Sequence, residues 1–203
     1  MRIEIALYDG FDELDAIGPF EVLAGVGPFD VALVTLGAAR TVTAAHGARI
    51  EAHATLADRP DLLVVPGGGW NDRRPAGARA EVDRGELPAA IAARHARGTR
   101  LASVCTGAML LAAAGLLRGR PAVTHHGAIG DLRAAGARVM PDARVVDDGD
   151  IVTAGGITSG IDLALWIVER ELGADAAKRA AGELEYTRDP RIWRASSLSA
   201  DGR

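Results

Sequence analysis

The chain contains a single cysteine, Cys105, at a position where a thiol would be chemically useful. An apolar run over 101–104 predicts a short buried strand, and the Ala/Leu/Met-rich run over 107–114 predicts a helix. Cys105 lies at the junction, near the free amides and the positive dipole end of that helix. This setting predicts a thiol pKa lowered from about 8.5 towards or below neutrality, and therefore a nucleophilic thiolate. The alternative is a small buried residue, since free cysteines are commonly buried.

Asp15, within Leu-Asp-Ala-Ile-Gly-Pro-Phe-Glu-Val, is a candidate carboxylate partner for the thiol. In that role it would transfer a proton or orient a water molecule. The alternative is a helix cap, because an aspartate at a helix start accepts hydrogen bonds from the first amides. Glu21 is a second acidic residue on the same helix, and its offset turns it in another direction.

The segment Pro66-Gly67-Gly68-Gly69-Trp70 ends a buried apolar strand abruptly. Consecutive glycines permit positive backbone dihedrals and close approach by a ligand. Free amides in such a segment would stabilise a developing negative charge, as an oxyanion hole does. A plain tight turn is the alternative. The segment lacks the Lys-Ser/Thr pair that a phosphate-binding loop requires.

Two adjacent histidines occur in Thr124-His125-His126-Gly127. His125 directly follows a short predicted strand, so it is a candidate general base or substrate-binding residue, with a surface or capping role as the alternative. No cysteine or acidic group at ligand spacing accompanies the pair, and we predict no metal site. The remaining histidines occur in loop, strand and helical contexts without such a pattern: His46, His53 and His95.

Length, charge and composition set the broad class of the protein. The 203 residues carry a net charge of -4 and predict one domain over 1–203, with a polar, loosely ordered tail at 187–203. Without a basic tail or a Cys/His finger, nucleic acid is not an expected partner. We predict a cytoplasmic protein for three reasons. The apolar runs are too short for a membrane span, the N-terminus has no signal-peptide core, and the lone cysteine cannot form an internal disulfide.

Strands and helices are expected to alternate along the chain. An alternation of apolar runs with helical patterns predicts a mostly parallel sheet covered on both faces, with reactive groups where strands end. Asp148-Gly149 predicts a hairpin turn between two short strands. Expected strands lie at 2–8, 31–36, 49–54, 62–65, 101–104, 122–124, 144–147 and 150–153, and expected helices at 14–24, 87–96, 107–114, 129–135, 159–172 and 174–184.

Taken together, these segments resemble the ThiJ/PfpI superfamily, related to the class I glutamine amidotransferases, and within it the isonitrile hydratase branch. The resemblance extends from the first strand to about Tyr186. It rests on the ordered set of Leu-Asp-Ala-Ile-Gly-Pro-Phe-Glu-Val at 14–22, Val-Pro-Gly-Gly at 65–68, Ser-Val-Cys-Thr-Gly-Ala at 103–108, Ala-Ala-Gly-Leu-Leu-Arg-Gly at 113–119 and Thr-Ala-Gly-Gly-Ile-Thr-Ser-Gly-Ile-Asp at 153–162.

The resemblance implies a flavodoxin-like three-layer α/β sandwich that forms a homodimer and carries its nucleophile on a strained elbow. It implies that Cys105 is the nucleophile and Asp15 the carboxylate beside it. Thr106 would contribute its backbone amide and hydroxyl, and Gly68 the opposing amide. Peptidase-like members have a histidine directly after the cysteine, whereas this chain has Thr106, which argues against a Cys-His protease.

The implied reaction is hydration of an isonitrile to an N-substituted formamide through a thioimidate, without a metal or organic cofactor. The chain departs from the hydratase pattern at His126, where that pattern has an aromatic residue, and after Tyr186, where it continues rich in proline. Two alternatives remain. One is a glyoxalase or deglycase acting on small aldehydes with the same thiol. The other is a ligand-binding or redox-sensing domain without turnover.

Overall fold

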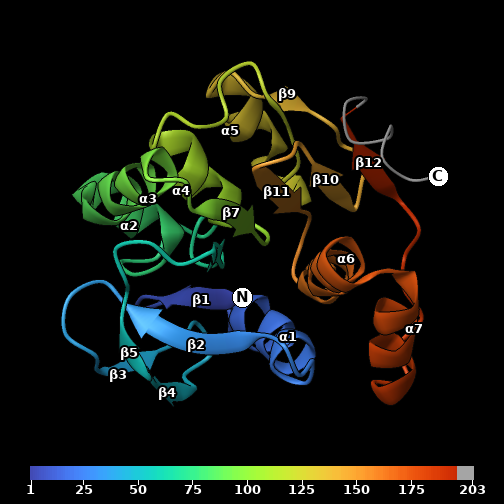
Figure 1. Ribbon diagram of the computed structural model, residues 1–203. Coiled ribbons are helices and arrows are strands. Elements are labelled where there is room, and N and C mark those ends of the chain that lie inside the picture. Colours follow the sequence, from blue (N-terminus) through green and yellow to red (C-terminus); the bar gives the residue numbers. More distant parts are fainter. Residues whose placement is uncertain (196–203) are drawn as a thin grey trace.

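Eight strands form one central sheet in the computed structural model, which describes residues 1–195 (Figure 1). Within this part of the chain, every neighbouring pair in the sheet is parallel except one antiparallel hairpin. The strands, in spatial order, are β12 (Ile192–Arg194), β10 (Val145–Asp147), β11 (Ile151–Ala154), β7 (Arg100–Ser103), β6 (Leu62–Val65), β1 (Arg2–Leu7), β2 (Asp30–Thr35) and β5 (Ala54–Thr55).

The centre of the sheet is apolar because helices cover it on both faces. All four residues of β6 and of β11 are buried, as expected for parallel strands between two helical layers. One group of contacting helices is α1 (Glu13–Ala24), α6 (Ser159–Leu172) and α7 (Ala174–Glu183); the other is α2 (Ala78–Arg84), α3 (Glu86–Ala96) and α4 (Gly107–Ala113). This confirms the predicted three-layer α/β sandwich. None of the described helices is long and apolar enough to cross a membrane.

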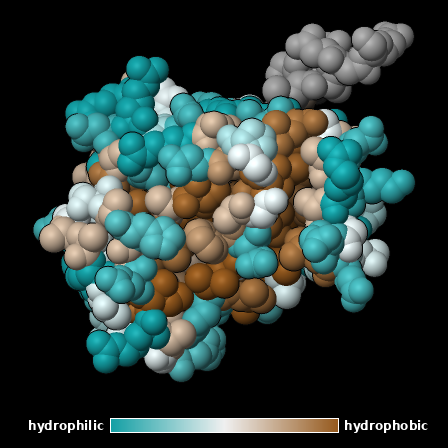
Figure 2. All heavy atoms as spheres, turned by 60° about the horizontal axis from the view of Figure 1, so that its bottom comes forward, coloured by the Kyte–Doolittle hydropathy of each residue, from teal (hydrophilic) through white to brown (hydrophobic). Residues whose placement is uncertain are grey.

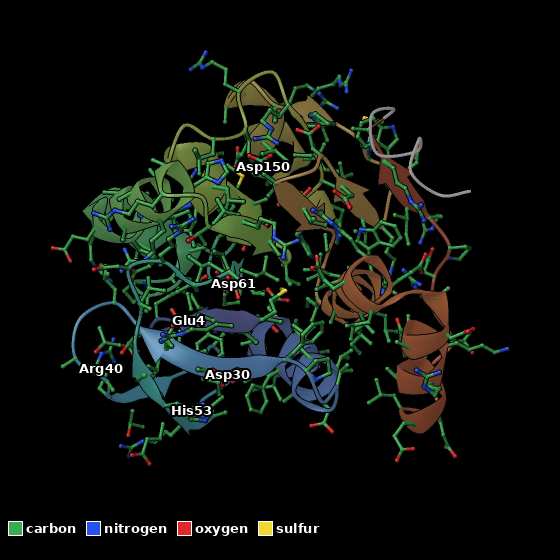
Figure 3. All side chains as sticks on the ribbon, in the orientation of Figure 1. Glu4, Asp30, Arg40, His53, Asp61 and Asp150 are labelled. Atoms are coloured by element: carbon green, nitrogen blue, oxygen red, sulfur yellow. The ribbon has the colours of Figure 1, made fainter. Side chains whose placement is uncertain are left out.

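The structure also contains smaller elements outside the central sheet and its two main groups of helices. They comprise two two-stranded ribbons, β3 (Thr41–Thr43) with β4 (Arg49–Glu51) and β8 (Pro121–Ala122) with β9 (Arg138–Val139), and the helix α5 (Ile129–Ala134) after a turn of 3-10 helix. Polar side chains, of which Glu4 is buried and His53 exposed, close the loops around β1 and β2 (Figure 3). Glu4 accepts from the Ala57 amide at 2.9 Å, and His53 Nδ1 accepts from the Leu33 amide at 3.2 Å. The role of His53 is therefore structural.

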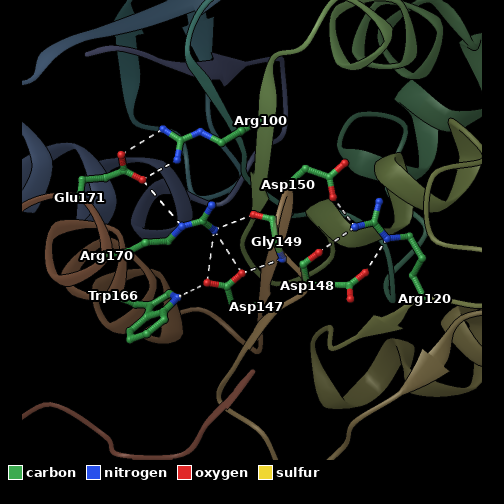
Figure 4. Close-up of polar contacts among 9 residues, drawn as sticks. All are labelled: Arg100, Arg120, Asp147, Asp148, Gly149, Asp150, Trp166, Arg170 and Glu171. Atoms are coloured by element: carbon green, nitrogen blue, oxygen red, sulfur yellow. Dashed lines mark hydrogen bonds and ion pairs between the residues drawn. The ribbon is translucent and has the colours of Figure 1, made fainter. Parts of the chain in front are cut away.

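The predicted hairpin at Asp148-Gly149 is confirmed, and a buried carboxylate anchors it (Figure 4). Asp147, at the end of β10, is 1% exposed. It accepts hydrogen bonds from Trp166 Nε1 at 2.8 Å, from Arg170 at 3.1 Å and from the Gly149 amide at 2.9 Å. These bonds tie the turn between β10 and β11 to the helix α6.

Replacing this carboxylate should destabilise the fold without touching the active site. Asp147→Ala leaves the Trp166 N–H without its acceptor and removes the buried carboxylate that pairs with Arg170, so we expect a loss of about 2–4 kcal/mol in the free energy of unfolding. Urea denaturation measures it. The matched control is Asp142→Ala, at an exposed aspartate, where a change within about 0.5 kcal/mol is expected. Equal stabilities for the two variants would contradict the structural role of Asp147.

The structure corrects three expectations. Helix α1 begins at Glu13 with Asp12 as its cap and contains Pro19, whose ring packs where α6 offers only Gly160. The helix α2 was not predicted. The tail is not loosely ordered up to Ala195, because β12 pairs with β10; residues 196–203 lie outside the described chain.

Candidate active site

Four parallel strands end at one edge of the sheet and gather the predicted site residues there. The neighbours β1, β6, β7 and β11 run in the same direction, so the segments that follow them converge. These segments bring together Asp15 after β1, Pro66 to Gly68 after β6, Cys105 after β7 and Ile157 after β11.

Cys105 occupies a strained elbow between β7 and α4. Its φ of +56° lies in the left-handed region, which costs free energy for a residue with a Cβ. The backbone is held there because the Cys105 amide donates to Gly155 O at 2.8 Å and to Ala154 O at 3.2 Å. Ile157, whose amide hydrogen-bonds the Cys105 sulfur, also has a positive φ, +26°. Strain at two touching residues is typical of a functional site.

Asp15 lies next to the thiol and is completely buried. It is not the helix cap: Asp12 caps α1 by accepting from the Leu14 amide at 3.1 Å. One carboxylate oxygen, Oδ2, accepts from the Gly67 amide at 2.9 Å. The other, Oδ1, has no hydrogen-bond partner among the described residues, and the Cys105 thiol beside Asp15 lowers the pKa of that carboxyl group. Asp15 is thus positioned to exchange a proton with the sulfur.

The pKa of the Cys105 thiol is raised to about 12, first by burial and then by the charge of Asp15. Hydrogen bonds from the amides of Ile157 and Thr106 oppose this rise without cancelling it. The expectation of a lowered pKa is therefore wrong, because the desolvation of Cys105, which is 5% exposed, outweighs the hydrogen bonds from these amides. The pKa of Asp15 is also raised, by burial and by Asp12. The charge of Asp15 raises the pKa of Cys105, so the titrations of the two groups are coupled.

The glycines after β6 fit closely around this pair. A Cβ on Gly67 would lie 2.5 Å from both the amide nitrogen and Oγ1 of Thr106, so no larger residue fits. The Gly68 amide donates to Thr106 Oγ1 at 3.0 Å, with Gly68 at φ +117°. The Gly68 amide, which was the predicted oxyanion donor, therefore already donates to the Thr106 hydroxyl. The Thr106 amide instead faces the Cys105 sulfur.

His125 is half-buried at the mouth of the site. Its Nδ1 accepts from the Gly127 amide at 3.1 Å and lies 3.3 Å from Asn71 Nδ2. Burial and the neighbouring His126 lower the pKa of His125, so the ring is neutral at pH 7. With Nδ1 used as an acceptor, the ring proton belongs on Nε2, which makes His125 a hydrogen-bond donor and not a base.

A cavity of about 220 Å³ opens beside the sulfur. Cys105, Thr106, Gly68 and His125 all line it, which brings the predicted site residues to one place, with Asp15 buried behind the thiol. Sequence reasoning pointed to the segment that contains Gly69 and Trp70, and it missed four other wall residues: Asp12, Asn71, Asp72 and Ile157. Of these, Ile157 was within reach, because Gly-Gly-Ile-Thr-Ser-Gly ends a strand at the same edge.

The described residues offer one group of metal-type donors, Asp12, Glu13 and His46, with atoms within 4.8 Å of one another. These donors already have partners. Glu13 accepts from the amides of His46 and Ala48 and from His46 Nδ1 at 2.7 Å. The arrangement joins the start of α1 to the β3–β4 loop, and we assign no metal to it.

The model of the DJ-1/PfpI family matches residues 1–170. The chain belongs to this family. An isonitrile hydratase from Pseudomonas putida is 35% identical over 192 residues, which cover 94% of this chain and 80% of the relative. A deglycase from Pyrococcus abyssi is 30% identical over 158 residues, covering 76% and 89% of the two chains. The crystal structure of a ThiJ/PfpI family protein from Pseudomonas syringae superposes with a TM-score of 0.82 at 31% identity, covering 93% and 76%.

Family membership confirms the resemblance read from the sequence motifs, and the flavodoxin-like fold with it. The family contains enzymes of more than one kind, among them hydratases and deglycases. The reaction of this chain must therefore be argued from its own residues.

Proposed function

We propose that this protein hydrates isonitriles to N-substituted formamides, with Cys105 as nucleophile and Asp15 as the proton-transfer group. The single observation that carries the proposal is the pairing of a buried carboxyl group with a buried thiol on an elbow. Hydration of an isonitrile needs a nucleophile and a group that delivers protons to carbon and nitrogen. The 35% identity with an isonitrile hydratase supports the same reaction.

The first half of the reaction forms the carbon–sulfur bond. The Asp15 carboxylate takes the thiol proton as the Cys105 sulfur attacks the terminal carbon of the isonitrile. The electron pair released at carbon accepts that proton from Asp15, which yields a thioimidate, R–N=CH–S–Cys105. The attack needs no resting thiolate, because the proton moves within the pair during the reaction.

The second half adds water and breaks the carbon–sulfur bond. Asp15 removes a proton from water as the oxygen adds to the thioimidate carbon, and passes it to the nitrogen. Collapse of the tetrahedral intermediate forms the formamide carbonyl and expels the sulfur, which recovers the hydroxyl proton. The Nε2–H of His125 is the donor that orients the substrate at the cavity wall, while the amide of Thr106 faces the sulfur.

Incubation with an alkyl isonitrile tests the proposal directly. Formation of the matching formamide, followed by the growth of its formyl proton resonance, is the expected result. A parallel incubation with methylglyoxal tests the second candidate, a glyoxalase or deglycase, which the 30% identity to the Pyrococcus abyssi enzyme favours. Lactate formation without formamide would overturn the hydratase proposal. Turnover of neither compound, with ready oxidation of Cys105, would instead indicate a sensor domain.

The tight fit at Gly67 gives a second test. Gly67→Ala places a Cβ against Thr106 and displaces the amide that faces Asp15. We expect formamide formation to fall by about 10²-fold, as for a small misplacement of reacting groups. Gly130→Ala is the matched control, since nothing lies within 4 Å of that Cβ in α5. Its activity should be unchanged, and an unimpaired Gly67→Ala would contradict the geometry.

We also propose that a second copy of the chain covers the apolar face of α1. Figure 2, which brings the bottom of Figure 1 forward, shows hydrophobic side chains gathered on this side. An apolar groove of about 280 Å³ lies between α1 and α6, with Leu14, Ile17 and Ile161 on its walls. Leu14 is 38% exposed on this groove, and a contiguous apolar surface of this kind is typical of an interaction site. A sedimentation mass equal to one chain would contradict the dimer.

A further inference from the structure

Tyr8 is a buried phenol that the proposed reaction does not use. It directly follows β1 and is 4% exposed. Its hydroxyl donates to the Pro66 carbonyl at 2.6 Å, across 58 residues of sequence. Burial raises the pKa of Tyr8 well above its ordinary value, so the phenol stays protonated and remains a donor.

The acceptor of this bond belongs to the peptide that contacts Asp15. The Pro66 carbonyl and the Gly67 amide are the two ends of one peptide bond, and the Gly67 amide donates to Asp15 Oδ2 at 2.9 Å. The peptide is planar, so fixing the direction of its carbonyl fixes the direction of its N–H. A hydrogen bond at the carbonyl also polarises the peptide and strengthens the N–H as a donor.

We propose that Tyr8 is a positioning residue of this active site, whose hydroxyl aims the Gly67 amide at Asp15 by holding the Pro66 carbonyl. The inference rests on the proposed roles of Asp15 and Cys105 and extends them by one residue. The next peptide bond, between Gly67 and Gly68, is also held by a hydrogen bond at each end. The Gly67 carbonyl accepts from the Asp12 amide at 2.8 Å while the Gly68 amide donates to Thr106.

Tyr8→Phe removes the hydroxyl and keeps the ring. A weaker donor at Gly67 stabilises the Asp15 carboxylate less, so the first ionisation of the Asp15–Cys105 pair moves to higher pH. We expect the acid-side midpoint of Cys105 alkylation by iodoacetamide to rise by about 0.5–1 pH unit. Well below both midpoints, the alkylation rate then falls by about 3- to 10-fold. The readout needs no isonitrile, so it stands or falls separately from the hydratase proposal.

The charged groups around the site stay in place in this variant. Asp12 and Glu81 face Tyr8 together with the Asp15–Cys105 pair, and Asp12 also faces Asp15. Tyr186→Phe is the matched control, because its hydroxyl also binds a buried acceptor, Asp162, at 2.9 Å. That variant should leave the alkylation midpoint unchanged.

A double-mutant cycle separates positioning from general stability. In an Asp15→Asn background, Tyr8→Phe should leave the pH dependence of alkylation unchanged, because the titrating partner is gone. A structural effect would appear equally in both backgrounds. An unchanged midpoint in Tyr8→Phe with Asp15 intact, or an equal shift in Tyr186→Phe, would overturn the proposal.

A second substitution keeps the test decisive if Tyr8→Phe folds poorly. The chain contains two tyrosines, so biosynthetic 3-fluorotyrosine in the Tyr186→Phe protein labels only Tyr8. Fluorination makes the phenol a stronger hydrogen-bond donor. The alkylation midpoint should therefore move to lower pH, opposite in sign to Tyr8→Phe. A midpoint that stays in place or rises would contradict the proposed role.

Discussion

Cys105→Ala should reduce formamide formation to the uncatalysed background, a loss of at least about 10³-fold, while the protein stays folded. The loss follows because no other described side chain near the cavity offers a sulfur nucleophile. The fold should persist because the backbone bonds of residue 105, to Ala154 and Gly155, use its main-chain amide. Formyl-proton NMR measures turnover, and circular dichroism with urea denaturation measures folding.

The control for this variant is Cys105→Ser, which restores a polar atom of similar size. A hydroxyl is a far weaker nucleophile than a thiol at this site, since Asp15 would have to deprotonate an alcohol. We therefore expect both variants to be inactive. Turnover by a folded Cys105→Ala protein would show that the isonitrile is hydrated without a covalent intermediate.

Asp15→Asn should lower kcat/KM for isonitrile hydration by about 10²–10⁴-fold. Asparagine still offers an oxygen to the Gly67 amide, so the local geometry is retained while the proton-transfer function is lost. In the wild type, the acid side of the pH profile reports the first ionisation of the pair, at a pH above the ordinary range of an aspartate because burial raises the pKa of Asp15. The variant should lack this acid limb. Kinetics from pH 4 to 9 provide the comparison.

Asp15→Asn, which lowers activity, should raise the free energy of unfolding relative to wild type as the pH increases. The pKa of Asp15 in the folded protein is raised above the value of 3.8 for a free side chain, so its contribution to stability is greatest below that pH. It is lost as the pH rises through the folded-state pKa. Asp15→Asn avoids this loss, and wild type should become less stable relative to the variant as the pH increases. A constant difference from pH 4 to 8 would contradict the burial of an ionisable carboxyl group.

Local sequence signals were sufficient for the frame of the site. The uninterrupted apolar runs at 62–65 and 101–104 identified two central strands, so Cys105 and the glycines after Val65 could be placed at one sheet edge. The hairpin turn at Asp148-Gly149 was also predicted correctly from the sequence. The strand β12 was not, because a three-residue strand that pairs with β10 has no periodicity of its own.

The electrostatics of the site could not be read from sequence. A helix start predicts a lowered thiol pKa, yet the sign at Cys105 depends on how completely α1, α4 and the strand ends exclude water. The role of Asp12 as cap in place of Asp15 depends on where α1 begins, which is one residue before the expected start. The contact of Tyr8 with Pro66 leaves no trace in spacing, because it joins segments 58 residues apart.

Intact-protein mass spectrometry of acid-quenched reactions tests the covalent route most directly. During turnover of an alkyl isonitrile, the account predicts a protein species heavier by the full mass of that isonitrile, since the thiol proton is kept on the thioimidate carbon. Peptide mapping should place the added mass on Cys105, and it should disappear once substrate is consumed. Steady formamide production with the protein mass unchanged, or with the adduct on another residue, would contradict the mechanism.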